Sequence, residues 1–273
     1  MKNIENKSKK TRKLKWYVKL LLLIIIIITF AFTIGTKGIF IKEYKIESSK
    51  ITLSDTGLKI LHFSDLHYGS TINMKSLKVI VKNINDAKAD IVIFTGDLID
   101  KNYKFKKDEQ ENVKDSLKDI NASLGKYYVN GEEDKVLCNL IMNDSNFINI
   151  DTKEQLIYNN DNKPILLIGN LSAKKYFNEN KIKPEFKILA MHNPNNVQEF
   201  KNYNFDIILA GHTHNGQINI FKLKDFIIKS KYNKPYQKVN NSDLFVSSGI
   251  GTSLIKARLF NHPTMNLYRI VKK

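Results

Sequence analysis

After residue 57, four apolar runs of strand length each give way directly to polar residues. The runs are 58–63, 91–94, 187–191 and 205–210. Continuous apolar runs this short are typical of buried strands. Between the first two runs, and again after the second, apolar residues recur at helical spacing, so strands alternate with helices. The helical positions are Leu77, Ile80, Val81 and Ile84, and then Val113, Leu117, Ile120 and Leu124.

From Cys138 onward the pattern changes to short strands. Segments 155–158 and 165–168 flank the polar sequence Asn159-Asn160-Asp161-Asn162 and predict a hairpin. Further strands are predicted at 147–148, 244–246 and 265–271. We therefore predict an α/β (α+β) fold in which two mixed β-sheets pack face to face, flanked by helices.

The N-terminus carries the longest apolar stretch, Leu20–Ile34. Its length approaches the roughly 20 residues that span the hydrocarbon core of a bilayer. Eight basic residues precede it against the single acid Glu5. By the positive-inside rule, this places the N-terminus in the cytoplasm and the rest of the chain outside the cell membrane. No Ala-x-Ala-like cleavage site follows Ile34, so we expect an uncleaved anchor, with a cleaved signal peptide as the alternative.

These features divide the chain into four segments. They are a basic cytoplasmic segment (1–19), a transmembrane anchor (20–36), a connector with the first strand (37–57) and one folded domain (58–273). The domain is long enough to bury a core without disulfide bonds. The only cysteine is Cys138, so an internal disulfide is excluded, and its distance from the N-terminus excludes a lipoprotein anchor.

The formal net charge of +17 has two sources. Residues 1–45 carry 11 Lys/Arg and 2 Asp/Glu, so about half of the excess belongs to the membrane topology. The remainder is spread over segments such as 101–107 and 222–238. These segments would either favour anionic lipid or polyanionic substrates at a membrane surface or form an ordinary solvated surface. No basic stripe with interleaved aromatic residues is present, so we expect no nucleic-acid partner. Nothing in the sequence indicates an obligate protein partner.

Each of the four strand-length runs ends in residues that can bind a metal ion. The groups are Asp65-Leu66-His67, Gly96-Asp97, His192 and Gly211-His212-Thr213-His214. Each group alone is weak evidence, because an Asp-x-His turn or a single surface histidine is common without a metal. Their joint occurrence at strand ends predicts two cations held about 3.5–4 Å apart by carboxylates and imidazoles. Of the six histidines, only His62 and His262 lie outside these groups.

The order of these motifs resembles that of the calcineurin-like metallophosphoesterase superfamily. It is most similar to the membrane-associated bacterial branch, which includes enzymes related to UDP-2,3-diacylglucosamine pyrophosphatases. The resemblance runs from about Glu43 to the C-terminus and takes in the tail 247–251 with Arg258, Leu259, Phe260 and Pro263. It implies a four-layer sandwich and two divalent metal ions, with manganese expected before iron or zinc.

The resemblance also implies a role for each ligand. Asp65, His67 and His214 would hold one ion, His192 and His212 would hold the second, and Asp97 would bridge both. A metal-bound hydroxide would then attack phosphorus in line. We expect Asp97, Glu133 and His212 to act in the catalytic step.

One motif departs from the family pattern. Where relatives carry Gly-Asn-His followed by Asp or Glu, this chain has Gly131-Glu132-Glu133-Asp134. Glu132 stands at the position of a metal-binding asparagine, and its carboxylate is still an oxygen ligand. Glu133 replaces a histidine that steadies the transition state or protonates the leaving group. Loss of such a group typically costs ~10²–10⁴-fold in rate.

Two functions follow from these observations. The first is a membrane-anchored phosphoesterase that hydrolyses a phosphoester or pyrophosphate bond of a small molecule or of a lipid or envelope substrate. The alternative is a weakened or inactive module that binds a metal or ligand, because Glu132 and Glu133 have replaced the Asn-His pair.

Overall fold

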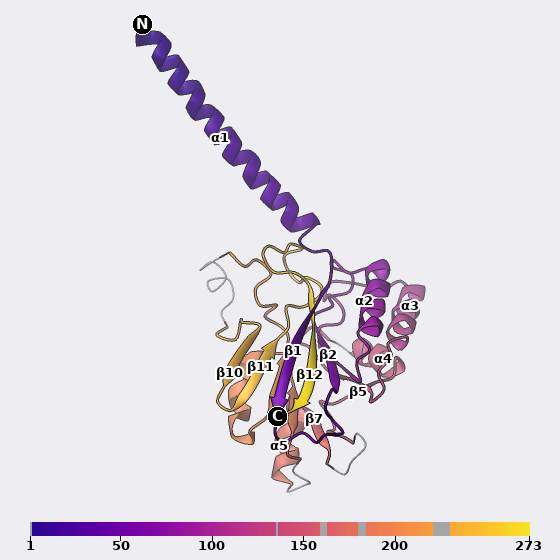
Figure 1. The fold of residues 1–273 in the computed structure, drawn as a ribbon. Coiled ribbons are helices and arrows are strands. Elements are labelled where there is room, and N and C mark those ends of the chain that lie inside the picture. Colours follow the sequence, from indigo (N-terminus) through magenta and orange to yellow (C-terminus); the bar gives the residue numbers. More distant parts are fainter. Residues whose placement is uncertain (1, 135, 159–162, 180–183, 221–229) are drawn as a thin grey trace.

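A computed structural model of the chain describes residues 2–134, 136–158, 163–179, 184–220 and 230–273. One long helix, α1 (Lys2–Thr33), projects from a domain built on two six-stranded sheets (Figure 1). The first sheet has the order β1-β12-β2-β3-β4-β5, and the second has the order β10-β11-β9-β8-β7-β6. Both sheets contain parallel and antiparallel neighbours, which confirms the predicted fold of two mixed sheets flanked by helices.

The first sheet consists of β1 (Phe40–Ser48), β2 (Lys59–Phe63), β3 (Ile91–Thr95), β4 (Lys126–Val129), β5 (Phe147–Asn149) and β12 (Thr264–Lys272). The second consists of β6 (Gln155–Ile157), β7 (Ile165–Gly169), β8 (Lys187–Ala190), β9 (Ile207–Ala210), β10 (Tyr236–Val239) and β11 (Ser242–Val246). The helices of the domain are α2 (Met74–Asp86), α3 (Lys107–Lys118), α4 (Val136–Asp144), α5 (Asn170–Asn178) and the 3-10 helix η1 (Pro194–Tyr203).

Strand direction decides which end of the sandwich carries the loops after β2 and β3. Strand β1 begins soon after α1 and runs away from it, and β12 lies parallel to β1. Strand β2 is antiparallel to β12, and β3, β4 and β5 follow β2 in parallel. These four strands therefore run back toward α1. Their carboxyl ends lie at the end of the domain where the long helix joins it (Figure 1).

The apolar runs of the sequence are explained by burial on both faces of the sheets. In β3, Ile91 and Ile93 face the second sheet, whereas Val92 and Phe94 pack under the helices α2, α3 and α4. All four side chains are at most 1% exposed. Strands covered on both faces read as continuous hydrophobic runs instead of alternating ones. The outer face of the second sheet is covered in the same way by α5 and η1, neither of which the apolar pattern predicted.

The first predicted helix is confirmed, and the second is shorter than predicted. In α2, the four predicted positions are buried against the sheet, and the Asn73 side chain caps the helix by accepting from the Ser76 amide at 3.0 Å. Helix α3 ends at Lys118, so the prediction that Ile120 and Leu124 lie on it was wrong. The Leu124 amide donates to the Asp90 carbonyl at 2.8 Å, which draws the chain out of the helix and into β4 beside β3.

The C-terminal half follows the predicted strands. Strands β6 and β7 pair antiparallel as the expected hairpin, although its turn at 159–162 lies outside the described residues. Residues 222–229 of the basic segment 222–238 also lie outside the described residues. Strands β11 and β12 contain the predicted segments 244–246 and 265–271, and Cys138 is buried on α4.

Helix α1 is long and apolar enough to cross a bilayer between Lys15 and Thr33. This window begins earlier than the predicted anchor 20–36 and ends before it, because the chain turns after Thr33. The end of the helix lies directly on a loop of the domain. Ala31 is buried against Ala257 and Leu259, and the Arg258 amide donates to the Ala31 carbonyl at 2.9 Å.

The burial between the sheets predicts the effect of truncating one side chain. Ile93→Ala should lower the free energy of unfolding by about 2–5 kcal/mol, because it removes buried methyl groups and leaves a cavity between two sheets. Ile148→Ala is the matched control, since Ile148 is 43% exposed on β5, and it should cost less than about 1 kcal/mol. Urea unfolding of both variants makes the comparison, and equal losses would contradict this description of the core.

Candidate functional site

The four predicted groups meet at one end of the sandwich. Asp65 and His67 follow β2, Asp97 follows β3, His192 follows β8, and His212 and His214 follow β9. The bond from the Gly211 amide to the His192 carbonyl, at 2.9 Å, ties two of these loops together. All of the groups are buried except His212, whose side chain is 33% exposed. Sequence positions up to 149 residues apart therefore form a single site.

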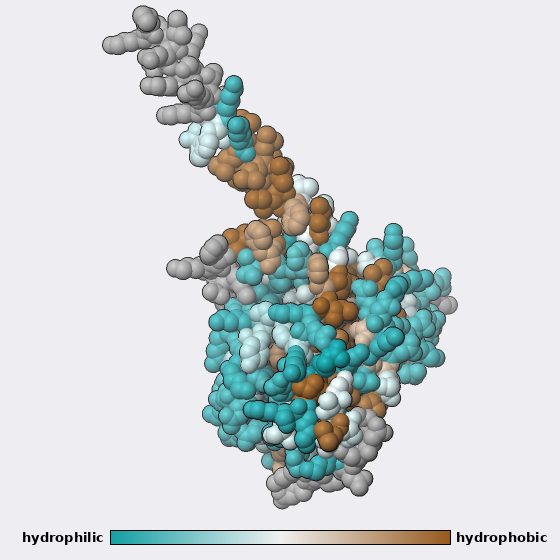
Figure 2. Space-filling model, viewed as in Figure 1, coloured by the Kyte–Doolittle hydropathy of each residue, from teal (hydrophilic) through white to brown (hydrophobic). Residues whose placement is uncertain are grey.

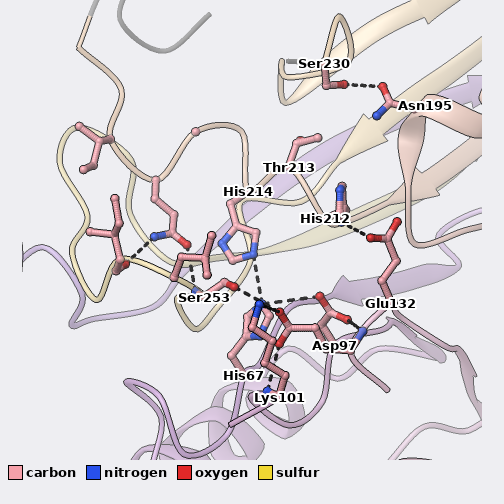
Figure 3. A pocket seen from close by; sticks show the side chains of 16 residues that line it. His67, Asp97, Lys101, Glu132, Asn195, His212, Thr213, His214, Ser230 and Ser253 are labelled. Atoms are coloured by element: carbon pink, nitrogen blue, oxygen red, sulfur yellow. Dashed lines mark hydrogen bonds and ion pairs between the residues drawn. The ribbon is translucent and has the colours of Figure 1, made fainter. Parts of the chain in front are cut away.

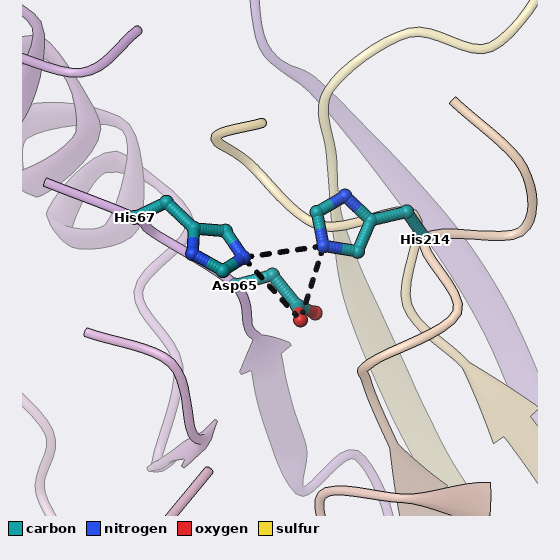
Figure 4. A group of neighbouring side chains, drawn as sticks. All are labelled: Asp65, His67 and His214. Carbon is teal, nitrogen blue, oxygen red and sulfur yellow. Dashed lines mark hydrogen bonds and ion pairs between the residues drawn. The ribbon is translucent and has the colours of Figure 1, made fainter. Parts of the chain in front are cut away.

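A first set of donor atoms comes from Asp65, His67 and His214 (Figure 4). Asp65 Oδ1 lies 3.2 Å from His214 Nε2 and 4.0 Å from His67 Nε2. The two imidazole Nε2 atoms are 3.4 Å apart. Three ligand atoms thus converge on one point, in the mixture of carboxylate and imidazole that suits first-row divalent metals.

A second set is centred on Asp97 and His192. Asp97 Oδ2 lies 3.2 Å from His192 Nε2 and 3.7 Å from His67 Nε2, so this carboxylate stands between the two sets. His192 Nδ1 lies 2.7 Å from the Thr95 carbonyl, to which it must donate. The buried Nε2 of His192 makes no hydrogen bond with any described residue. A ring held through Nδ1–H with Nε2 left free has the form of a metal ligand, so the residues fit a cation here.

The charges in this cluster are strongly interdependent. Burial would raise the pKa of the Asp65 carboxyl, but the imidazoles of His214, His192 and His67 hold that pKa below its usual range. Burial lowers the pKa of His214, which favours its neutral, ligating form. Burial also opposes charge on His192, yet the Asp97 carboxylate 3.2 Å from its Nε2 and the nearby Asp65 carboxylate raise the pKa of its imidazole to about 10. The two buried carboxylates therefore attract positive charge, whether protons or cations.

The backbone at the site is held in an uncommon conformation. Asp65, His67, Asp97, His212 and His214 have φ values of 51°, 42°, 61°, 66° and 50°. Residues other than glycine rarely adopt positive φ, and such strain costs of order 1–3 kcal/mol each unless the surroundings impose it. Hydrogen bonds between the loops impose it here. The Asp65 amide donates to Gly96 at 2.9 Å, the His67 amide to the Asp97 carbonyl at 3.0 Å, and the His212 amide to Asp65 Oδ1 at 3.0 Å.

Asp134 holds the loop that follows β3, and the sequence analysis gave it no role. Its carboxylate accepts from the amides of Asp97, Leu98 and Gly131, each at 2.8 Å. The two loops approach so closely that a Cβ at Gly131 would lie 2.1 Å from Asp97 Oδ1. The sequence did contain a sign of this residue, because an acid ends the departing motif Gly131-Glu132-Glu133-Asp134.

Glu133 lies beside the first set of donors. Its Oε2 atom is 3.3 Å from His67 Nδ1 and accepts from the Lys101 amide at 3.2 Å. Hydrogen bonding to His67 is the main cause that lowers the pKa of the Glu133 carboxyl to about 2. Its backbone amide donates to Asp97 Oδ1 at 2.9 Å. Glu133 is therefore an ionised carboxylate within reach of the ligand groups.

Glu132 lies farther out. Its carboxylate accepts from the Asn193 side chain at 2.7 Å, and its other oxygen lies 3.8 Å from His212 Nδ1. The rings of His192 and His212 are 5.2 Å apart between centroids. Figure 3 shows the Glu132 and His212 side chains next to each other in the lining of the pocket. The structure thus places both residues next to the second set, at its exposed side.

A pocket of about 540 Å³ opens over these groups. Its lining includes His67, Asp97, His212 and His214 together with Lys101 and Ser253 (Figure 3). This volume is in the range of small-molecule binding sites.

Arg258 supports the site from behind and was also given no role by the sequence analysis. Its side chain is fully buried, and burial lowers the pKa of the guanidinium to about 10. It donates to the carbonyls of Ser248, Gly249 and Gly251 at 2.9, 3.0 and 2.6 Å. The Gly251 amide in turn donates to the Asp65 carbonyl at 2.8 Å. The geometry of the first set thus depends on this buried cation.

The remaining two histidines lie outside the cluster, as expected. His62 is buried in the core, 2.8 Å from Thr95 Oγ1, and burial lowers the pKa of its imidazole to about 3. His262 is exposed and its ring contacts Phe40.

Comparison with known proteins agrees with this geometry. Residues 58–216 match the calcineurin-like phosphoesterase family. The uncharacterized metallophosphoesterase YkuE of Bacillus subtilis is 26% identical over 244 residues, which cover 84% of each chain. UDP-2,3-diacylglucosamine pyrophosphatase LpxG of Chlamydia muridarum is 23% identical over 263 residues, covering 76% of this chain and 74% of that protein. A putative 5'-nucleotidase from Staphylococcus aureus aligns with a TM-score of 0.46 at 11% identity, over 79% of this chain and 54% of that one.

The family match covers more than half of the chain and includes all of the strand-end groups. The protein therefore belongs to the calcineurin-like metallophosphoesterases, which are metal-dependent phosphoester hydrolases.

Proposed function

We propose that this protein is a membrane-anchored phosphoesterase that uses two divalent cations to hydrolyse a phosphoester or pyrophosphate bond. The observation that carries the proposal is the position of Asp97, whose Oδ2 lies within 4 Å of ligand atoms from both donor sets. The relative LpxG is named for a pyrophosphatase acting on UDP-2,3-diacylglucosamine. A phosphorylated small molecule or lipid is therefore the substrate class to test first.

The two ions would be divided between the two sides of Asp97. Asp65, His67 and His214 would hold one. His192 would hold the other together with His212, whose ring lies beside it, with Glu132 at the exposed side. Asp97 would contribute to both. Manganese is the expected metal, with iron or zinc as alternatives, since imidazole with carboxylate suits these ions better than calcium.

In the bound state, the cations would polarise the phosphoryl oxygens and lower the pKa of a water. The protein's own contribution is to fix the groups around them. Asp134 and the Glu133 amide hold Asp97 by its backbone and Oδ1, which leaves Oδ2 free to face both donor sets. The Thr95 carbonyl fixes the tautomer of His192. Such supporting hydrogen bonds orient metal ligands and preserve their basicity.

Glu133 has two opposing effects in this mechanism. It would hold the Nδ1–H of His67 and so direct Nε2 toward the centre of the site. An ionised carboxylate, however, repels a phosphate and has no proton for the leaving group. The Lys101 ammonium, 3.9 Å from Glu133 Oε1, offsets part of that charge. We therefore expect turnover to depend strongly on the leaving group. If Glu133 reduces the rate for every leaving group, the protein would be a nearly inactive module that binds a metal or ligand.

The proposed sharing of Asp97 predicts metal content. After reconstitution with manganese, the protein should bind two ions per chain, and Asp97→Asn should reduce this to one or none because its carboxylate serves both ions. His262→Ala removes an exposed histidine outside the site and should retain both ions. Elemental analysis of the three proteins checks this. An unchanged metal content in Asp97→Asn would contradict the proposal that both ions share Asp97.

The position of Glu133 predicts an effect on the rate. Glu133→His should raise turnover of phosphodiesters with poor leaving groups by about 10- to 100-fold, because it supplies a proton donor where a carboxylate stands. Nitrophenyl diesters should gain less, since nitrophenolate leaves without a proton.

Glu133→Gln is the matched control, because it removes the charge without adding an acid. It should give the same modest gain on both classes of ester. Glu132→Asn should change metal affinity more than turnover, since Glu132 stands beside a proposed ligand. If Glu133→His leaves all rates flat or lower while metal stays bound, the impaired-acid explanation is wrong.

The basic N-terminus predicts the orientation of the domain. With eight basic residues before Leu20, the N-terminus should stay inside and everything after Lys37 should face outward. Protease added to intact cells should digest the domain while a cytoplasmic marker protein remains whole. Digestion that requires cell lysis would reverse the proposed topology.

A further inference from the structure

The loop between β11 and β12 contacts both the end of α1 and the pocket. We call residues 253–260 the rim segment. At one end of it, Ser253, Leu254 and Ile255 line the pocket. Toward the other end, Ala257 and Leu259 pack on Ala31, and the Arg258 amide is bonded to the Ala31 carbonyl. A Cβ at Gly35 would lie 2.0 Å from the Arg258 carbonyl oxygen, so only a small residue permits this close contact.

The rim segment is also fastened to the ligand-bearing loop after β9. The Gln217 side chain donates to the Ile255 carbonyl at 2.8 Å and accepts from the Ser253 amide at 3.2 Å. The Leu259 amide donates to the Gln217 carbonyl at 2.9 Å, and the Asn261 side chain donates to the His214 carbonyl at 2.6 Å. The rim segment therefore keeps a fixed position relative to both the site and α1.

The rim segment exposes large apolar side chains. Leu254 is 83% exposed, Phe260 is 70% exposed and Ile255 is 48% exposed. Phe40, at the start of β1, is 55% exposed, and its ring contacts that of His262, two residues after Phe260. Figure 2 shows apolar surface continuing from α1 onto the end of the domain that meets it. Clustered exposed apolar residues of this kind mark a contact surface.

The position of α1 indicates what this surface contacts. Ala31 lies in the last turn of the apolar window 15–33 and so at the boundary of the hydrocarbon that this window would span. Leu254 is three residues from Ala257, which touches Ala31. Three residues of chain reach at most about 10 Å. With α1 spanning a bilayer, the rim segment would lie within the interfacial layer of that bilayer. Lys256 and Lys37 are exposed there and could attract anionic head groups.

We propose that the rim segment inserts Leu254, Ile255 and Phe260 into the leaflet beside the domain, and that the substrate is a lipid of that leaflet with a phosphoester or pyrophosphate in its head group. The proposal rests on the proposed phosphoesterase function and on α1 spanning the membrane. The pocket admits a head group to the ligand cluster, while Leu254 and Ile255 at its mouth contact the first methylenes of the chain. The lipid tail then remains in the bilayer during hydrolysis.

Insertion can be measured without any activity. Trp16 is the only tryptophan of the chain, so Trp16→Phe with Leu254→Trp places one fluorophore on the rim segment. In nanodiscs containing phospholipids brominated in their acyl chains, its emission should shift to the blue and fall about twofold, since interfacial side chains reach 5–10 Å into the boundary. The matched control is Leu53→Trp in the same background, because Leu53 is 79% exposed in the loop that follows β1, at the end of that strand away from α1.

The control should emit as a solvated indole without quenching. Equal, unquenched emission from both positions would overturn the proposal, and would leave water or a protein partner as the neighbour of the rim segment.

Substrate entry is tested by a ratio of rates in the full-length, manganese-loaded protein. One probe is hexadecyl nitrophenyl phosphate embedded in nanodiscs, and the other is bis-nitrophenyl phosphate in solution. In each case one water is consumed, the P–O bond to nitrophenolate breaks, and the other ester stays intact. Leu254→Ser should lower the ratio of the embedded rate to the soluble rate about tenfold. Leu53→Ser should leave that ratio unchanged.

The two hypotheses fail in different ways. If the metal-loaded protein hydrolyses the soluble diester and Leu254→Ser leaves the ratio unchanged, entry from the leaflet is wrong and the phosphoesterase proposal stands. If neither diester is hydrolysed although both ions are bound, both the phosphoesterase proposal and the proposed lipid substrate are wrong. The quenching result still decides whether the rim segment inserts into the membrane.

Discussion

Two buried carboxylates, Asp65 and Asp97, share one end of the sandwich with three buried imidazoles, and the rest of the site is arranged around them. Burying two negative charges this close together is costly unless positive charge and hydrogen bonds compensate them. The compensation comes from His67, His192 and His214, and from the His212 and Glu133 amides, which donate to the carboxylates. Directing these side chains toward one point requires a strained, left-handed backbone at Asp65, His67, Asp97, His212 and His214.

Much of the fold could be predicted from the sequence, because strands buried on both faces leave uninterrupted apolar runs. The candidate site could be predicted too, because four of these runs are followed by residues that can bind a metal ion. The features that could not be predicted depend on contacts between segments far apart in the chain. Nothing local shows that Leu124 must leave a helix to bond with Asp90, or that Arg258 gathers three carbonyls behind Asp65. Asp134 acts through backbone amides, so the residue type alone does not reveal its role.

The closeness of α1 to the candidate metal site follows from the topology of the first sheet. Strand β1 leaves α1 and runs the length of the domain beside β12, so the strands that lead to this site return toward α1. The end of the sandwich that holds the candidate metal site is thereby the end on which α1 rests (Figure 1). A helix joined at the opposite end of β1 would instead have lain far from the pocket.

The central claim is that Asp65 and Asp97 organise a site for two cations that share Asp97. Anomalous X-ray scattering from crystals of the manganese-loaded protein tests it most directly. The account predicts two anomalous peaks about 3.5–4 Å apart, one among Asp65, His67 and His214 and one against His192, with the Asp97 carboxylate between them. A single peak, or peaks away from Asp97, would contradict it.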